Sequence, residues 1–312
     1  MDVAGTRLFV YDLGARDAPA LLYLHGGPGM GCHEFVRWQG AALARRGLRV
    51  VAFDQRGTHH SDPVAAEEEL TESVLVDDCR ALRERLGLDR LFVLGHSFGG
   101  RIALRYAARY PENTAGVVFE NPGWDPFSTE RIRMPALAEI YAAHGDDEKA
   151  RECLALARRE NPFAEGYRVD LIAGTASLGE SWYLYDRSDT ALLGQERLAV
   201  LDEEADERAA EKLIAHPALL EDLTPLLAGV RARGVPARLI VGEADLVTAP
   251  RQIEAFARAF GAGAVARVAE AAHFVQGEQR EVYAGLVADF VHAAVAAPGP
   301  SAVSATSSSA QA

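Results

Sequence analysis

The chain has 312 residues, enough for one large α/β domain or for one domain with an insertion. Its formal net charge of −13 disfavours nucleic acid and anionic membranes as partners, and favours substrates that are neutral or carry an amine. Cys32, Cys79 and Cys153 form no C-x-x-C motif, no apolar run reaches the length of a membrane span, and the N-terminus lacks a secretory pattern. We therefore expect a cytoplasmic protein with reduced thiols.

Apolar runs alternate with helical patterns along the first 120 residues. An early antiparallel strand is predicted over 6–13, and buried strands are predicted over 20–24, 48–53, 91–94 and 115–119. The spacing of apolar residues predicts helices over 34–46, 70–86 and 101–110. Such an order implies parallel pairing through right-handed crossovers, with helices on both faces of the sheet.

The pattern changes after Trp124. Residues 125–227 contain charged amphipathic helical patterns and no clear strand. Strand and helix patterns then resume over 237–241, 250–260, 265–268 and 278–295. We expect an α/β core of residues 1–124 and 228–297, with residues 125–227 inserted as a helical cap. Residues 298–312, rich in Ser and Ala without periodicity, predict a disordered tail.

A turn of small residues joins the predicted strand 91–94 to the helix that follows. Its sequence, Gly95-His96-Ser97-Phe98-Gly99, has the G-x-S-x-G spacing of a nucleophile elbow, in which glycines two positions from the serine permit a sharp turn. Ligands of parallel sheets bind outside the carboxyl ends of the strands. We interpret Ser97 as a nucleophile that faces a cleft; the alternative is an ordinary Gly-Ser turn.

A serine nucleophile requires a base, and an acid that orients the base. Asp245 follows the predicted strand 237–241 and His273 follows the strand 265–268, so both are expected at the same edge of the sheet as Ser97. The alternatives are that Asp245 only caps a helix, with Glu243 or Glu120 as the acid, and that His273 is an ordinary loop histidine.

Two backbone N–H groups are expected to stabilise the oxyanion of an acyl-transfer reaction. Phe98, directly after the nucleophile, provides one of them. Gly27 in the glycine-rich loop 25–29 provides the other, and Gly26 is expected to line the substrate site beside it.

Histidines near these motifs invite other interpretations. His59, His60 and Asp62 could suggest a metal site, but adjacent histidines seldom bind one ion and the sequence provides no suitably spaced third ligand. We therefore predict no metal site and no cofactor. His96, beside the nucleophile, is expected to pack under the sheet rather than to react.

Together these motifs resemble the α/β-hydrolase superfamily, and within it the proline iminopeptidase branch, over residues 8–290. The matching motifs are H-G-G-P-G at 25–29, D-Q-R-G at 54–57 with Ser61, and G-x-x-D at 242–245 with Pro250. The elbow departs from the branch, because His96 and Phe98 replace a glycine and a tryptophan; His59 also stands where glycine is usual. The resemblance implies an α/β-hydrolase fold with an inserted helical cap.

The resemblance also implies that acidic cap residues bind the free amino terminus of the substrate. Trp182-Tyr183-Leu184-Tyr185-Asp186 is similar to the branch's W-x-x-W-E motif, so Trp182 and Asp186 are expected in the substrate site. The alternative is an aromatic core patch with a solvated Asp186. A second cap acid has no clean match; Asp202 or Glu203 is nearest. Glu120 and Trp124 are expected to border the cleft.

We therefore expect a cofactor-free serine hydrolase, an aminopeptidase or amidase of proline iminopeptidase type that acts on small molecules or short peptides with a free amine. The alternative is an esterase, lactonase or thioesterase acting on a small metabolite. Less favoured alternatives are a non-hydrolytic lyase or cyclase and a ligand-binding protein on the same fold. We expect no nucleic-acid or membrane partner, and a monomer or small homo-oligomer.

Overall fold

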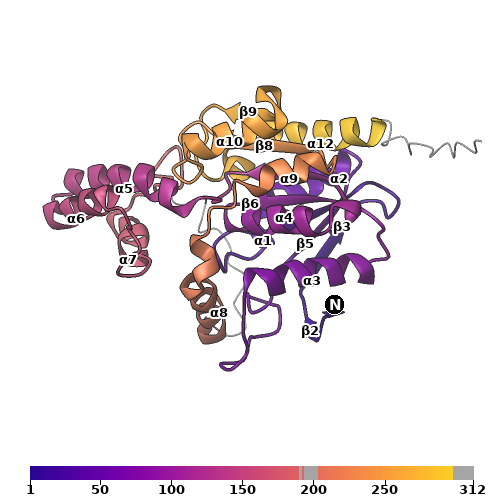
Figure 1. The fold of residues 1–312 in the computed structure, drawn as a ribbon, viewed down its shortest axis with the longest axis horizontal. Helices are drawn as coiled ribbons and strands as arrows, with labels where there is room; N and C mark the ends of the chain where they lie inside the picture. Colours follow the sequence, from indigo (N-terminus) through magenta and orange to yellow (C-terminus); the bar gives the residue numbers. More distant parts are fainter. Residues whose placement is uncertain (190–191, 193–202, 298–312) are drawn as a thin grey trace, which may run out of the picture.

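The computed structural model describes residues 1–189, 192 and 203–297 (Figure 1). The predicted tail 298–312 lies outside these residues. Within them, seven strands form the central sheet in the order β3 (Val10–Leu13), β5 (Arg49–Phe53), β4 (Ala20–Leu24), β6 (Leu91–His96), β7 (Thr114–Glu120), β8 (Ala237–Gly242) and β9 (Val265–Val268). β3 is antiparallel to β5, and the other neighbours pair in parallel. The mostly parallel sheet expected from the sequence is confirmed.

The predicted strand 6–13 is divided in two. β2 (Thr6–Arg7) pairs antiparallel with β1 (Asp2–Val3) in a separate small sheet, and only β3 joins the central sheet. The strand divides because backbone N–H groups between β2 and β3 bond to side chains of the loop after β5. The Arg7 N–H donates to the Asp62 carboxylate and the Phe9 N–H donates to the Ser61 hydroxyl, each over 3.0 Å.

Helices cover both faces of the sheet. One face packs against α3 (Glu72–Arg85), α4 (Phe98–Arg109), α9 (Leu226–Ala232) and α10 (Pro250–Phe260). The other packs against α1 (His33–Phe35), α2 (Ala41–Arg45), α11 (Val275–Glu278) and α12 (Arg280–Ala296). Because both faces are covered, every residue of β4 and β5 is buried, which explains the apolar runs 20–24 and 50–53. Arg49, the first residue of β5, is paired with Asp12 of β3.

The predicted helix 34–46 is interrupted. Between α1 and α2, residues Val36–Gly40 form the π-helical segment η1, in which the neighbours Trp38 and Gln39 are both buried. The Gln39 amide donates to the backbone oxygens of Gln276 and Arg280, over 2.7 and 3.1 Å. The wider turn thus directs a polar side chain toward the start of α12, which a period of 3.6 does not predict.

Between β7 and β8 the described residues form only helices: α5 (Pro126–Ala143), α6 (Asp147–Arg158), α7 (Val169–Ala173), η3 (Gly174–Leu178), α8 (Glu203–Ala215) and η5 (Pro217–Leu220), followed by α9. α5, α6 and α7 extend away from the sheet, while α8 lies below its edge (Figure 1). The outer helices have a hydrophobic cluster of their own. The division into core and cap at residues 125 and 227 stays a prediction.

Two further sequence expectations concern membranes and thiols. None of the described helices is long and apolar enough to cross a membrane. The three cysteines are free and buried.

Candidate active site

Ser97 lies at the sharp turn between β6 and α4. Its backbone has φ 53° and ψ −118°, a conformation that costs free energy for any residue with a Cβ. A Cβ on Gly99 would overlap the Leu24 carbonyl oxygen of the neighbouring strand, and one on Gly95 would overlap the Gly99 carbonyl oxygen. The glycines of the motif are therefore required because backbone segments approach closely, and this packing holds the serine in its strained turn.

His273 and Asp245 follow β9 and β8 and meet beside the elbow. His273 Nδ1 lies 2.8 Å from Asp245 Oδ1, and the other carboxylate oxygen accepts a hydrogen bond of 2.7 Å from the Thr248 N–H. The Asp245 side chain is fully buried and that of His273 is 2% exposed. The carboxylate thus fixes Nδ1–H on the imidazole and leaves Nε2 as the free basic nitrogen.

Burial lowers the pKa of His273 below its usual 6.5, although the hydrogen bond that His273 donates to Asp245 acts in the opposite direction. The imidazole is therefore neutral near pH 7 and able to accept a proton. His96, wholly buried, lies beside it with a ring-centroid distance of 4.8 Å, and its Nδ1 is 3.4 Å from the Glu120 carboxylate.

Asn121 is a positioning residue that the sequence analysis did not identify. Its amide donates to the backbone oxygens of Ala272 and His273 over 2.8 and 2.9 Å, and its carbonyl accepts the Gly242 N–H over 3.0 Å. With φ 42°, it ties the end of β7 to the two loops that carry the acid and the base. The sequence signal for Asn121 is its position shortly after the end of the predicted strand 115–119.

The two expected oxyanion donors border the same cavity as Ser97. Among the described residues, neither the Gly27 N–H nor the Phe98 N–H donates to another group. The loop that carries Gly27 is fixed by His25: its Nδ1–H donates to the Gly26 oxygen over 2.9 Å, and its Nε2 accepts the Gln55 N–H over 3.0 Å. Burial lowers the pKa of His25 to about 4, which keeps the imidazole neutral in this role.

The cavity has a volume of about 250 Å³ and is mostly apolar. Its lining combines the core loops with the cap and comprises Gly27, Pro28, Ser97, Phe98, Arg101, Gly123, Pro126, Thr129, Arg133, Tyr167, Val169, Ile172, Trp182, Tyr183, Ile214, Leu219, Val247 and His273. The segment after α7 contacts the loop of His273 directly, since the backbone N–H of His273 donates to the backbone oxygen of Tyr183 over 2.9 Å. Gly26 is not in this lining; it packs against His96 and Ser97.

Glu120 and Trp124 do not border the cavity, so these two predictions are corrected. Glu120 is fully buried, and its carboxylate accepts hydrogen bonds of 2.9 Å from the Gln276 N–H and the Tyr283 hydroxyl. Trp124 is also fully buried, and its indole N–H donates to the Gly100 oxygen. Both side chains turn inward because internal partners satisfy their polar atoms. Glu120 therefore does not replace Asp245 at His273.

The predicted amine-binding segment is only partly in the site. Trp182 lines the cavity, and its indole N–H donates to the Ile172 oxygen over 3.0 Å. Asp186 is exposed, and its carboxylate accepts hydrogen bonds from the Ser188 N–H and hydroxyl over 3.0 and 2.6 Å. The chain turns after Trp182, so Asp186 points away from the cavity and its predicted role is corrected.

The other predicted acids and the loop histidines lie elsewhere. Asp202 is outside the described residues, and of Glu203 only the backbone at the start of α8 is described. His59 contacts Asp206 of α8 and His60 contacts Asp54, with 3.4 Å between the imidazole Nδ1 and a carboxylate oxygen in each pair. No group of three or more His, Cys, Asp or Glu side chains suited to a metal occurs in the described part of the chain.

Arg133 and Tyr167 are among the cavity residues that the sequence analysis did not predict. Arg133 lies on α5, where the charged amphipathic pattern gave it the appearance of a surface residue, and Tyr167 lies in the loop before α7. Only tertiary packing turns these side chains toward Ser97, so no motif in the sequence marks them.

Comparisons with known proteins agree with this geometry. The family model described as "alpha/beta hydrolase fold" matches residues 19–148. The proline iminopeptidase of Neisseria gonorrhoeae is 35% identical over 112 residues, which cover 36% of this chain and 35% of that protein. The proline iminopeptidase of Flavobacterium johnsoniae is 28% identical over 148 residues, covering 47% and 46%. These matches thus span less than half of the relatives' own length.

A solved structure extends the similarity along the chain. The proline iminopeptidase-related protein from Thermus thermophilus has a TM-score of 0.69 and 26% identity, over 95% of this chain and 96% of that one. The chain therefore has the α/β-hydrolase fold. Within that fold it resembles the proline iminopeptidases.

Proposed function

We propose that the chain is a serine hydrolase that forms an acyl-enzyme on Ser97. The observation that carries the proposal is the meeting of Ser97, the His273–Asp245 pair and two unused backbone N–H groups at one cavity. Ser97 Oγ attacks the substrate carbonyl while His273 Nε2 takes its proton, and the Gly27 and Phe98 N–H groups stabilise the oxyanion. His273 then protonates the leaving group, and a water molecule, deprotonated by the same nitrogen, releases the acid.

Two substrate classes remain, each supported by a different observation. The resemblance to proteins named proline iminopeptidases supports an aminopeptidase or amidase. The cavity supports the esterase, lactonase or thioesterase alternative, because none of its described lining residues is an aspartate or glutamate that would pair with an ammonium group. We rank the second class first on this ground. A cytoplasmic location and a monomer or small homo-oligomer remain proposals from the sequence.

The test compares wild type, Ser97→Ala and the control Ser177→Ala, whose hydroxyl is exposed on η3. Release of nitrophenol from short acyl esters and of arylamine from prolyl arylamides is measured, together with labelling by a fluorophosphonate. Loss of the nucleophile is expected to cost on the order of 10⁶-fold, and the control is expected to retain activity. Labelling of Ser97→Ala to the wild-type extent would contradict the proposal, and the substrate that turns over decides between the two classes.

A further inference from the structure

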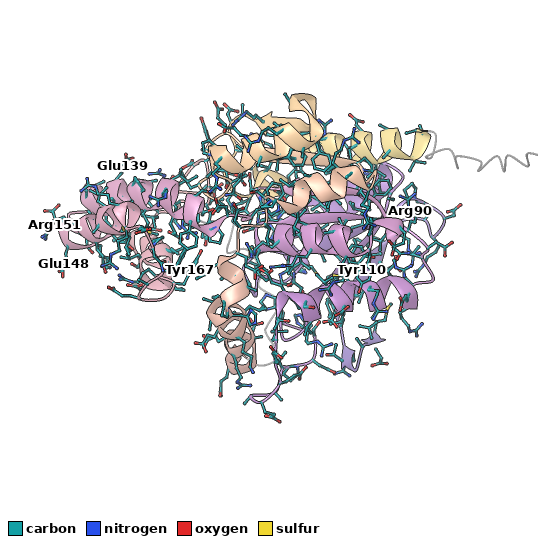
Figure 2. The ribbon with its side chains drawn as sticks, in the orientation of Figure 1. Arg90, Tyr110, Glu139, Glu148, Arg151 and Tyr167 are labelled. Carbon is teal, nitrogen blue, oxygen red and sulfur yellow. The ribbon has the colours of Figure 1, made fainter. Side chains whose placement is uncertain are left out.

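One wall of the cavity carries a buried positive charge, the guanidinium of Arg133. Arg133 on α5 is 4% exposed, and its guanidinium lies over the rings of Trp182 and Tyr167, 5.2 and 5.6 Å from their centroids. All three side chains line the cavity. Figure 2 shows Tyr167 between the outer helices and the core. The aromatic rings therefore hold the charge of Arg133 at the wall of the cavity.

The hydrogen bonds of Arg133 leave donors unused. Nη2 donates to the Glu130 carboxylate and, over 2.8 Å, to the Tyr167 hydroxyl, but Nε is buried and donates to no described residue. Burial acts to lower the pKa of Arg133, whereas Glu130 and Tyr167 raise it, so the guanidinium stays charged. The Tyr167 hydroxyl, as the acceptor of that bond, keeps its own proton for a further acceptor. A buried donor without a partner is costly unless a ligand completes it.

The other arginine of the cavity differs from Arg133. Arg101 donates to Glu72 and to four backbone oxygens, which leaves only one N–H, on Nη2, without a described acceptor. Among the described lining residues there is no aspartate or glutamate, and Glu130 is not among them. The second carboxylate oxygen of Glu130 is buried without a described partner, but it lies outside the lining. Most of the unused donors in the lining thus belong to Arg133 and Tyr167, and they match an anionic acceptor.

We propose that Arg133, with Tyr167, binds a carboxylate of the substrate separate from the carbonyl that Ser97 attacks. This inference rests on the proposed hydrolase function and narrows its substrate class to esters, lactones or thioesters of small carboxylic acids that carry a second acid group. A guanidinium stacked on aromatic rings is fixed in orientation, and a planar carboxylate accepts two of its N–H groups. The apolar remainder of the cavity packs around the carbon chain.

The test uses nitrophenyl monoesters whose chains differ only at the far end: adipate with a carboxylate, 6-methylheptanoate with an isosteric isopropyl group, and 6-aminohexanoate with an amine. In a second series, butanoate is esterified with 3-hydroxybenzoate or with 3-methylphenol. This series places the second acid group of the substrate in the alcohol part of the ester instead of the acyl part. Values of kcat/KM, corrected for spontaneous hydrolysis, are measured for wild type and variants.

Removal of Arg133 alone leaves Glu130 buried without its partner, which threatens folding. The principal variant is therefore the double change Glu130→Gln with Arg133→Met, which removes both charges, and Arg133→Met accompanies it. The control is Arg151→Met, an exposed arginine at the outer end of the cap (Figure 2). Far-ultraviolet circular dichroism and melting temperature establish that each variant is folded.

In wild type, kcat/KM for the carboxylate ester is expected to exceed that for the apolar ester of the same series about tenfold or more in at least one series, and in the first series it should also exceed that for the amine ester. The ratio of carboxylate to apolar ester should fall about 10- to 100-fold in both Arg133 variants and stay unchanged in Arg151→Met. A preference for the amine, or a ratio unaffected by Arg133, overturns the inference while the hydrolase proposal stands. If Ser97 neither labels nor turns over any ester, the hydrolase proposal itself fails.

Discussion

The environment of His273 sets the pH range in which the proposed base acts. Its side chain is buried against aromatic rings, with the centroids of Tyr183 and His96 5.5 and 4.8 Å away, so protonation is penalised. Asp245 offsets part of this penalty through its hydrogen bond. Because a general base must be neutral, a lowered pKa extends activity toward acid, whereas a raised pKa would restrict it to alkaline solution.

We therefore predict that the acid limb of kcat/KM for a neutral ester lies below pH 6.5, the usual value for histidine. Asp245→Asn should reduce kcat about 10⁴-fold, because an amide in place of the carboxylate favours the wrong tautomer of the imidazole. The pH profile of the initial rate from pH 4 to 9 measures both effects.

Glu243→Gln is the matched control for this experiment, because Glu243 is exposed in the same loop and was an alternative acid in the sequence. It should leave kcat within twofold of wild type. A large loss in Glu243→Gln with little change in Asp245→Asn would show that the geometric assignment of the acid is wrong.

Single residues also show what the sequence could and could not predict. Ser97, Asp245 and His273 were predictable because backbone topology alone places strand ends together. Asp186 and Trp124 were not, because the direction of a side chain depends on the local turn and on partners distant in sequence. Arg133 reaches the cavity only through the packing of α5, which the helical pattern does not reveal.

At the scale of elements, close approach between α4 and β4 fixes the elbow. Gly99 lies where the first turn of α4 passes the end of β4, and a Cβ there would overlap the Leu24 and His25 carbonyl oxygens. Backbone atoms of a central strand cannot move aside as a flexible side chain can. The nucleophile's position therefore depends on the absence of a single methyl group.

Gly99→Ala is accordingly expected to destabilise the protein by about 3 kcal/mol and to reduce esterase activity. The control is Gly229→Ala on α9, where a Cβ would meet no atom within 4 Å. That substitution should stabilise by about 0.5–1 kcal/mol, because alanine loses less backbone entropy in a helix. Urea unfolding measures both values; equal stability of the two variants would contradict the packing argument.

The order of elements was more predictable than their detail. Strand and helix patterns gave the parallel sheet and its helices, since buried strands must be continuous apolar runs. The division of strand 6–13 and the π-helical segment Val36–Gly40 were missed, because each depends on polar partners from another part of the chain. Local periodicity contains no signal for such long-range hydrogen bonds.

At the scale of the whole molecule, an ion pair joins α8 to the loop after β5. His59, in the loop after β5, donates its backbone N–H to Asp206 of α8 over 2.8 Å, and its Nδ1 lies 3.4 Å from the same carboxylate. Its Nε2–H donates to the Met30 oxygen over 2.8 Å. Both ring nitrogens thus face acceptors, which favours the imidazolium form.

This pair makes the attachment of α8 pH-dependent. Burial acts to lower the pKa of His59, but Asp206 and the Met30 oxygen raise it above 6.5. A raised pKa in the folded state contributes stability that is fully present below the unfolded value of 6.5, and that is lost as pH rises through the folded value. Lys212 also joins α8 to the core, through hydrogen bonds to the Ala66 and Glu68 oxygens that do not involve this pair.

We predict that amide protection of residues 206–214, measured by hydrogen exchange and corrected for intrinsic rates, is about fivefold lower at pH 8.5 than at pH 6, which corresponds to about 1 kcal/mol. Asp206→Asn removes the titrating attraction and should show the lower protection at both pH values. Glu204→Gln on the exposed side of α8 is the control and should follow wild type. If wild type and Asp206→Asn are equally protected at pH 6, the pair does not hold α8 to the core, and the hydrogen bonds of Lys212 and the packing of Ala209 and Leu213 must do so.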